Sequence, residues 1–151
     1  MKKILTPIML ISFFYTGYSQ KLQEAGVPAA VKTKFASLYP GVKSIEWEKE
    51  DGNYEAEFKQ DQTETSALFD ASGSLVQTET EMAVTALPRG VLDYVSKNLN
   101  SKKITEAARI VDAGGQVTYE AEIGGRDYIF DAKGNFIKAE DDDPEDDEDN
   151  H

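Results

Sequence analysis

The chain contains no cysteine, and its one histidine, His151, is the last residue. Without cysteine there is no disulfide framework, no thiolate nucleophile, no zinc-thiolate site and no lipid attached through an N-terminal cysteine. A Ser-His-Asp triad or a histidine metal site would lack its ring nitrogen in the body of the chain. Glycine-rich phosphate loops are missing too, because Gly114-Gly115 and Gly124-Gly125 each lack a following predicted helix. These absences predict a protein that is not an enzyme and has no cofactor.

Basic residues are also scarce, since the chain has 28 acidic and 16 basic residues and a net charge of −12. Nine of the acidic residues lie within residues 140–149. Without these nine and the lysines at positions 2 and 3, 14 basic and 19 acidic residues remain, a net charge of −5. Both the body and the tail repel polyanions, which excludes nucleic acid and anionic lipid as partners.

Long apolar runs are absent except near the start, where residues 4–15 follow Lys2 and Lys3. This layout is typical of a secretory signal peptide, and the run is too short to span a bilayer. Gly17 and Ser19 are small residues at positions −3 and −1 of a cut after Ser19. We therefore expect residues 1–19 to be a signal peptide and the mature protein to be exported, periplasmic or extracellular, with no membrane insertion after cleavage.

Two sequence motifs each occur twice in the chain. Tyr-Glu-Ala-Glu followed by an apolar residue stands at 54–58 and again at 119–123. An apolar residue followed by Phe-Asp-Ala, one residue and Gly stands at 68–73 and again at 129–134. The chain is therefore expected to contain two copies of one module.

The first copy has a helical period and then a period of two. A helix is predicted between Val27-Pro28 and Pro40-Gly41, because apolar residues follow its helical spacing and proline is tolerated in a first turn. Alternating apolar and acidic residues around the Asp51-Gly52 turn then predict a hairpin. The remaining expectations are an irregular polar leader at 20–26, a polar loop at 59–63, and strands at 64–69 and 74–80.

The second copy begins at Leu87-Pro88, with a helical stripe at Val91, Val95 and Leu99. Gly90 should weaken this helix by up to ~1 kcal/mol relative to alanine. Strands are expected at 104–112, 116–123, 126–131 and 135–139.

Together these patterns predict an α+β fold with two tandem modules, each one helix followed by a four-stranded antiparallel meander. The sheets should lie side by side with the helices on one face, since alternation predicts one buried and one wet face. The predicted divisions are a signal peptide at 1–19, modules at 20–82 and 83–139, and a disordered acidic tail at 140–151.

Several of these motifs, in this order, resemble the PepSY-like secreted proteins of Bacteroidetes. They are the start of the first helix (27–31), its exit (38–41), the repeated strand (54–58) and the turn (69–73). The resemblance covers residues 27–139 and implies a fold like that of the β-lactamase inhibitor protein, with a periplasmic or surface location. Some members of the family are described as calcium-regulated periplasmic proteins. The resemblance brings no catalytic residues to this chain.

The repeated carboxylates are candidates for ligand contact. Glu55 and Glu57 lie two apart on one predicted strand, as do Glu120 and Glu122, so each pair projects from one face roughly 7 Å apart. Such a pair would suit acid and base catalysis on a glycosidic bond. A solvated sheet face is the favoured interpretation, because no apolar segment nearby would separate the two pKa values.

Aromatic residues are the other contact candidates, since tryptophan and tyrosine dominate binding hot spots. Tyr54 and Tyr119 are better explained as core residues, whereas for Trp47 core and contact surface are equally supported.

The acidic tail alternates Asp141, Asp143, Glu145 and Asp147, which makes these residues candidate metal ligands. Pro144 and the absence of glycine from 140–151 exclude the sharp turn of an EF-hand, so calcium would be held loosely. A disordered, solubilising tail is favoured, because like charges at this density repel and extend the chain.

The sequence thus predicts a secreted, non-catalytic binding module that recognises a protein, peptide or other envelope ligand across its exposed sheet face. The alternative is a calcium-responsive periplasmic protein that uses the acidic tail. An acid-base hydrolase that uses Glu55 and Glu57 is the remote alternative.

The signal peptide gives the first testable prediction. Export should remove residues 1–19, because the basic start, apolar run and small residues fit a signal peptidase site. Intact mass and N-terminal sequencing of the exported protein should give a chain that starts at Gln20. A mature chain that retains the apolar run would show that the segment is an anchor.

Overall fold

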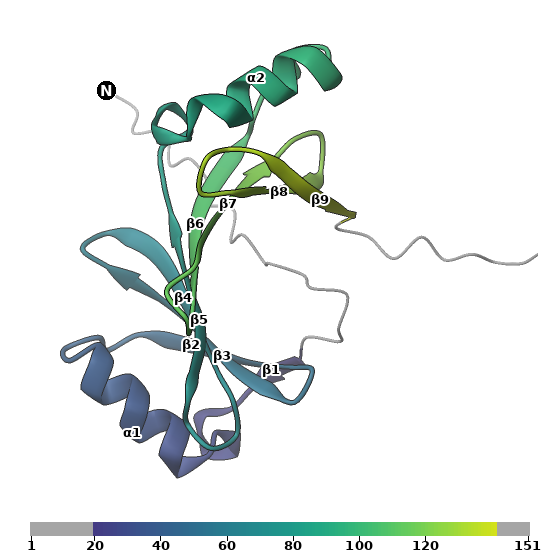
Figure 1. Cartoon of the computed structure of the whole chain (residues 1–151). Helices are drawn as coiled ribbons and strands as arrows, with labels where there is room; N and C mark the ends of the chain where they lie inside the picture. The colour runs from purple at the N-terminus through teal and green to yellow at the C-terminus, as the bar shows by residue number, and fades with distance from the viewer. Residues whose placement is uncertain (1–19, 142–151) are drawn as a thin grey trace, which may run out of the picture.

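The computed structural model describes residues 20–141, which fold into strands and two helices (Figure 1). The elements, in chain order, are β1 Gln20–Leu22, η1 Glu24–Gly26, α1 Ala29–Leu38, β2 Ile45–Glu50, β3 Asn53–Gln60, β4 Thr63–Phe69, β5 Leu75–Glu81, η2 Val84–Ala86, α2 Arg89–Asn98, β6 Glu106–Asp112, β7 Val117–Glu122, β8 Arg126–Asp131 and β9 Phe136–Asp141.

All the strands of this part of the chain form one nine-stranded antiparallel sheet, and they stand in the sheet in chain order. The α+β class predicted from the sequence is confirmed. The strands after α1 and those after α2 are joined in the middle by β5 and β6, which pair from Gln77 opposite Asp112 to Glu81 opposite Ala108. The sheet is therefore continuous, where the sequence predicted two sheets side by side.

Both helices cover the same face of this sheet. Residues paired across neighbouring strands project to one face, and Thr78 of β5 is paired with both Ala67 of β4 and Val111 of β6. Ala67 packs under α1, and Ala107, which packs under α2, lies on the same side of β6 as Val111. We call this side the helical face and the other side the open face. The sheet twists strongly, so α1 and α2 lie near opposite ends of the molecule (Figure 1).

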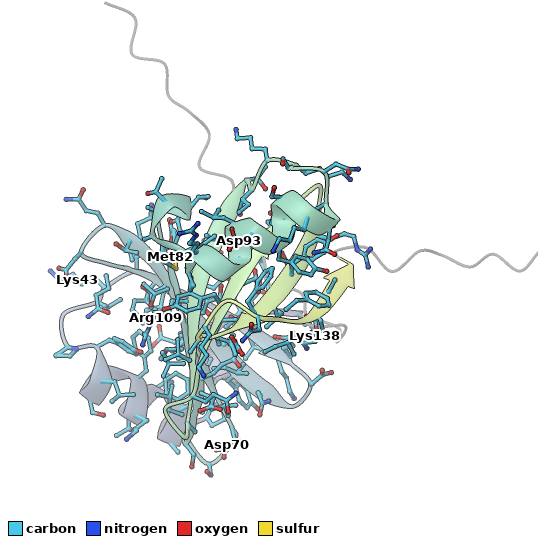
Figure 2. The ribbon with its side chains drawn as sticks, turned by 45° about the horizontal axis from the view of Figure 1, so that its top comes forward. Lys43, Asp70, Met82, Asp93, Arg109 and Lys138 are labelled. Atoms are coloured by element: carbon cyan, nitrogen blue, oxygen red, sulfur yellow. The ribbon has the colours of Figure 1, made fainter. Side chains whose placement is uncertain are left out.

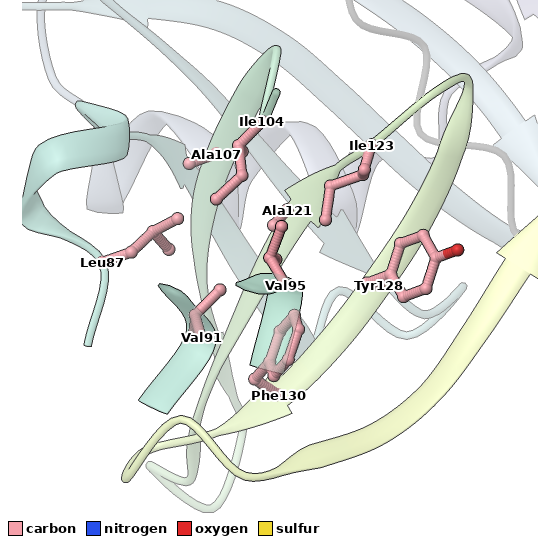
Figure 3. Packing of buried hydrophobic residues seen from close by; sticks show 9 residues of the cluster. All are labelled: Leu87, Val91, Val95, Ile104, Ala107, Ala121, Ile123, Tyr128 and Phe130. Atoms are coloured by element: carbon pink, nitrogen blue, oxygen red, sulfur yellow. The ribbon is translucent and has the colours of Figure 1, made fainter. Parts of the chain in front are cut away.

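Each helix buries its apolar stripe in a separate cluster. Val31 and Phe35 of α1 pack against the residues of β2, β3 and β4 on the helical face. Val91 and Val95 of α2 pack against β6, β7 and β8 in the same way (Figure 3). Phe69 and Phe130, one from each repeated motif, are completely buried. The helical period seen in the sequence thus identifies the residues that hold each helix on the sheet.

The chain is more regular than expected in two mostly polar stretches. Residues 20–22, expected to be an irregular leader, form β1 on the edge of the sheet beside β2. The polar loop expected at 59–63 is also wrong, because β3 runs to Gln60 and only Asp61 and Gln62 form the turn. Both turn residues have positive φ, 50° and 69°, as in a type I′ hairpin. Residues 59–64, at the tip of this hairpin, are all polar, so apolar alternation does not indicate a strand there.

The last strand also exceeds its expected length. β9 runs to Asp141, with Glu140 paired to Asp127 and Asp141 to Arg126, although the disordered tail was expected to begin at 140. Pairing with β8 supplies the backbone hydrogen bonds that keep these two acidic residues in the sheet. The rest of the predicted tail and the predicted signal peptide lie outside the described residues.

Gly90 is where α2 meets the turn between β8 and β9. A Cβ atom at Gly90 would lie 2.8 Å from the carbonyl oxygen of Gly134 and 2.9 Å from that of Lys133. Gly134 has a φ of 85°, and a Cβ there would lie 2.9 Å from the Gly90 Cα. The glycine that lowers helix propensity is thus required for the close approach of the helix to the turn.

This contact predicts that Gly90→Ala destabilises the protein. Helix propensity alone would stabilise the variant by up to ~1 kcal/mol. The overlap with backbone atoms should outweigh that gain, because overpacking costs about 1 to 3 kcal/mol and backbone cannot rotate away as a side chain can. Urea unfolding followed by circular dichroism measures the difference in the free energy of unfolding.

The matched control is Ser96→Ala, at an exposed position of the same helix. This control should leave the protein unchanged or slightly more stable. A Gly90→Ala variant as stable as Ser96→Ala would show that the turn moves away from α2 at no cost.

Candidate functional site on the open face

The open face carries acidic side chains on almost every strand. Register places them there, because each is paired with or lies two residues from another residue of that face. They are Glu46, Glu48 and Glu50 of β2, Glu55 and Glu57 of β3, Glu64 of β4, Glu79 and Glu81 of β5, Glu106 and Asp112 of β6, Glu120 and Glu122 of β7, Asp127 and Asp131 of β8 and Glu140 of β9.

Three lysines of the open face form ion pairs near its periphery. Lys21 of β1 lies 3.2 Å from Glu46, and Lys59 of β3 lies 2.7 Å from Glu64. Lys138 of β9, labelled in Figure 2, pairs with Glu140 of the same strand. These partners are partly exposed, so the pairs contribute little to stability.

The centre of the open face is buried although neither helix of residues 20–141 covers it. Glu79 is 4% exposed, and Glu55, Glu120 and Asp127 are 7%, 7% and 8% exposed. We call these four residues together with Glu57 the acidic centre. In Figure 1 the sheet bends so that its two ends lie on either side of this face.

Apolar side chains form the floor of the acidic centre. Ala108, Ile110 and Ile129 are buried, yet none belongs to the cluster under either helix. Ile110 is paired with Glu79, and Glu120 is paired with both Ala108 and Ile129. We call these three residues the apolar floor. The expectation that the second face is simply wet is therefore wrong at its centre.

Burial shifts the acid-base properties of the first Glu pair. Loss of solvent raises the pKa of Glu55 to about 7, an effect opposed by a hydrogen bond with Ser66 and reinforced by Glu50 and Glu48. Loss of solvent also raises the pKa of Glu57 to about 7, together with the charges of Glu55, Glu48 and Glu46, against a smaller opposing effect of Lys21. The solvated face expected for this pair is incorrect.

These values bear on the remote hydrolase alternative. An acid-base pair works when its environment separates the two pKa values. Here both carboxyl groups shift to about 7, so the surroundings do not distinguish an acid from a base.

Glu79 lies deepest. Burial raises the pKa of Glu79 well above its usual value, and the nearby charges of Glu120, Glu55, Asp127 and Glu57 add to the rise. Its Oε1 atom is buried without a hydrogen-bond partner. Such a group costs free energy unless something neutralises or bonds it.

Three carboxylates converge at one side of the open face, and two of them, Glu55 and Glu57, belong to the acidic centre. Glu48 of β2 is paired with Glu55 of β3, and one oxygen from each of Glu48, Glu55 and Glu57 lies within 4.8 Å of the others. We call these residues the carboxylate triad. Oxygen atoms at this spacing are able to bind one cation together.

A hollow reaches one member of the carboxylate triad, Glu57. The hollow has a volume of about 740 Å³ and lies between the segment that follows α1 and the β3–β4 hairpin. Glu46 and Glu57 are among its lining residues. Glu57 thus belongs to the acidic centre and is also reached from the edge of the sheet.

The structure separates the contact candidates that the sequence grouped together. Glu55, Glu57, Glu120 and Glu122 share the open face, and Glu122 accepts a hydrogen bond from Thr105 at 2.7 Å. Trp47 is 6% exposed and packs edge-on against Phe35 of α1, with ring centroids 5.5 Å apart. Trp47 is a core residue on the helical face, so it is left out of the site.

Of the four candidate metal ligands of the tail, only one lies within the described residues. Asp141 ends β9. Asp143, Glu145 and Asp147 lie outside the described residues.

Sequence reasoning missed Glu79, Asp127 and the apolar floor. A signal for the floor was present, because Tyr128-Ile129-Phe130 is an unbroken apolar run. Such a run is typical of a strand that is buried on both faces. Glu79 had no such signal, since it stands in a polar strand and is buried only through the pairing of β5 with β6.

The raised pKa values predict that stability falls as pH rises. In the folded protein Glu55 and Glu57 hold protons up to about pH 7, while the unfolded chain loses them near the usual value of 4.5. The folded state therefore binds more protons between these values, and the free energy of unfolding decreases across that window. Urea midpoints measured in a chelating buffer should be higher near pH 5 than near pH 8.

Glu55→Gln tests the cause of this dependence. Glutamine keeps the shape but does not ionise, so the variant should lose less stability between the two pH values and exceed the wild type near pH 8. Glu24→Gln, at an exposed position outside the sheet, is the control and should follow the wild type. A Glu55→Gln variant with an unchanged pH profile would show that this carboxyl titrates normally.

Comparison with known proteins places this geometry in a family. The profile described as "putative beta-lactamase-inhibitor-like, PepSY-like" matches residues 16–76 and, in a second match, 53–138. No curated protein sequence matches the chain. Neither helix of residues 20–141 has the length and apolar character needed to cross a membrane.

Solved structures show the same fold. A BLIP-like protein of Bacteroides fragilis is 25% identical, with a TM-score of 0.60 over 80% of this chain and 90% of its own. A structure from Bacteroides eggerthii, described as a periplasmic protein, is 17% identical, with a TM-score of 0.68 over 76% and 88% of the two chains. A DUF2874 family protein of Bacteroides ovatus is 20% identical, with a TM-score of 0.66 over 74% and 85%.

The periplasmic description agrees with the location predicted from the sequence. The two profile matches together span residues 16–138, which is most of the chain. The family predicted from the repeated motifs is confirmed, and the chain belongs to the PepSY-like, β-lactamase-inhibitor-like family.

Proposed function

We propose that this is a non-catalytic binding protein of the cell envelope whose ligand lies across the open face of the sheet. The observation that carries the proposal is the acidic centre, in which buried carboxylates surround an apolar floor. An apolar surface with a few convergent polar groups is the usual composition of a binding site. On the helical face, by contrast, α1 and α2 cover the two apolar clusters of residues 20–141.

The charge of the site indicates the charge of its ligand. Burial and mutual repulsion raise the pKa values of Glu55, Glu57 and Glu79. A positively charged ligand would relieve both penalties, since an opposite charge favours the ionised form of each carboxyl group. The ligand is therefore a protein or peptide segment that carries lysine or arginine.

The relatives support a binding role. The family description and the Bacteroides fragilis structure both refer to an inhibitor of β-lactamase, and a protein inhibitor acts by binding its target. The description of the Bacteroides eggerthii structure supports a periplasmic location for this chain after export. Neither description assigns a catalytic role.

We also infer that the protein consists of two copies of one module, at 20–82 and 83–139. In support, α1 precedes four strands and α2 precedes four strands, and each helix has its own apolar cluster. Val31 and Val91 occupy the same place in the two clusters, and so do Phe69 and Phe130. The open face extends over both modules, so a ligand across it would contact residues of each.

Site-specific photo-cross-linking tests where the ligand lies. A photoreactive residue at Leu68 or Glu81, on the open face, should capture an envelope protein in living cells. The same residue at Lys34 of α1 or Ser96 of α2, both exposed, is the matched control and should capture little. Equal capture from both sides, or capture only from the helices, would show that the open face is not the binding surface.

A charge variant tests the chemistry of the ligand. Glu81→Lys places a positive charge beside the acidic centre, opposite Ala108 of the apolar floor. In this variant the yield of the cross-link from Leu68 should fall severalfold. In the protein with Glu81 intact, added salt should also lower the yield, because screening weakens attraction between exposed charges. An unchanged yield would exclude a cationic ligand.

A further inference from the structure

The carboxylate triad has the geometry of a cation site. Its three oxygen atoms come from Glu48, Glu55 and Glu57 and lie within 4.8 Å of one another. Calcium binds oxygen at 2.3 to 2.6 Å, so two ligands on opposite sides of one ion are about 4.8 Å apart. We propose that the triad binds a single Ca²⁺ ion on the open face.

The position of the triad in the sheet favours an ordered site over a chance crowding of charges. Glu48 and Glu55 face each other across β2 and β3, and Glu57 is two residues further along β3 on the same face. Backbone pairing therefore fixes the three Cα positions, and little freedom is lost when the side chains converge on an ion. Pre-organised ligands of this kind bind more tightly than the same residues on a loop.

Glu79 supplies an independent indication that a cation belongs here. Its side chain is 4% exposed and its Oε1 atom has no hydrogen-bond partner. Glu79 stands in the same cross-strand row as Glu57, since Ser66 is paired with both residues, and it lies close enough to Glu55 and Glu57 for their charges to act on it. Among residues 20–141 this oxygen has no donor, and the acids whose charges act on it are Glu120, Glu55, Asp127 and Glu57. A cation bound by Glu55 and Glu57 would offset part of that repulsion.

The type of ligand selects the type of ion. Every candidate ligand is a carboxylate oxygen, and the described residues contain no cysteine or histidine, which are the ligands that zinc prefers. Magnesium requires a near-ideal octahedron with short bonds, while calcium accepts irregular sites with bidentate carboxylates. Side chains projecting from two twisted strands are irregular, and this favours calcium.

This inference deepens the proposed function and rests on it, because the ion would lie within the proposed binding surface. A bound Ca²⁺ ion would neutralise two of the three charges of the triad. It would leave the carboxylates around the apolar floor, including Glu120 and Asp127, available to the cationic segment of a partner. The site is separate from the acidic tail, whose four candidate ligands share no residue with the triad.

Calcium titration of the purified protein tests the site. Isothermal titration calorimetry should show one Ca²⁺ ion bound per chain at neutral pH, and Glu57→Gln and Glu48→Gln should each weaken this binding by about tenfold or more, as loss of a ligand does. The matched control is Glu81→Gln, which removes the same charge from the same face but lies outside the triad. Glu81→Gln should change the affinity less than about twofold.

Three results would overturn the inference. The first is a wild-type protein that binds no calcium. The second is an equal loss of affinity in Glu57→Gln and Glu81→Gln, which would mean diffuse attraction to an acidic surface. The third is Mg²⁺ binding as tight as Ca²⁺ binding at the same residues, which would contradict the choice of ion.

Terbium luminescence keeps the test independent of how well the variants fold. Tb³⁺ substitutes for Ca²⁺, and Trp47, the chain's one tryptophan, precedes Glu48 in β2 and would sensitise an ion bound there. The wild-type protein should show tryptophan-sensitised emission that Ca²⁺ removes, and its absence would count against the site. Cross-links from Leu68 that persist although calcium does not bind would refute the ion and leave the proposed function standing. Calcium binding at the triad, together with cross-links only from the helices, would support the ion and refute the proposed function.

Discussion

The pairing of β5 with β6 is the constraint on which the rest of the molecule depends. These strands join the helix-and-sheet unit of α1 to that of α2 and make one sheet of nine strands. Their register sets Glu79 opposite Ile110. A shift by one residue would turn Glu79 toward the helical face, because successive side chains of a strand alternate between faces. The helical face is thus shared by two helices, and the open face becomes one surface.

The buried carboxylates at the centre of the open face destabilise the folded protein. Glu55, Glu79, Glu120 and Asp127 are buried among one another and beside apolar side chains, in a chain that already has a net charge of −12. Burial of a carboxyl group is unfavourable for its charged form. Proteins keep such arrangements chiefly where a site needs them, and the helical face shows that this chain also builds ordinary apolar clusters.

The two glycines at the contact of α2 with the β8–β9 turn show the same competition between local and tertiary preferences. Gly90 is unfavourable for an isolated helix, but only a residue without a Cβ atom fits 2.8 Å from the Gly134 carbonyl oxygen. In α1 the equivalent residue, Ala30, approaches the turn glycine Gly73 instead. Each helix therefore contacts the last hairpin of its own strands at a turn glycine, and only the α2 contact has a second glycine on the helix.

The sequence by itself determined the elements whose signals are local. The apolar stripes at Val31 and Val91, the Asp51-Gly52 turn and the repeated motifs at 54–58 and 119–123 predicted the helices, most strands, the α+β class and the family. They did so because a helix or hairpin is specified by neighbours a few residues apart. The three-residue β1, with Leu22 as its one apolar residue, and the polar turn at Asp61-Gln62 are too short to show such a period, and they were missed.

Only the tertiary structure decided which carboxylates are buried and which are wet. Glu55 and Glu57 look like any exposed pair on an alternating strand, and Glu79 stands among polar residues in β5. Their burial and raised pKa values arise from strands far away in the chain, since Glu79 is affected by Glu120 and Asp127 of β7 and β8. Charge and solvent act through space rather than along the chain. The sequence therefore indicated Glu55, Glu57 and Glu120 as candidates, whereas Glu79, Asp127 and the burial of the whole group followed only from the register and bend of the sheet.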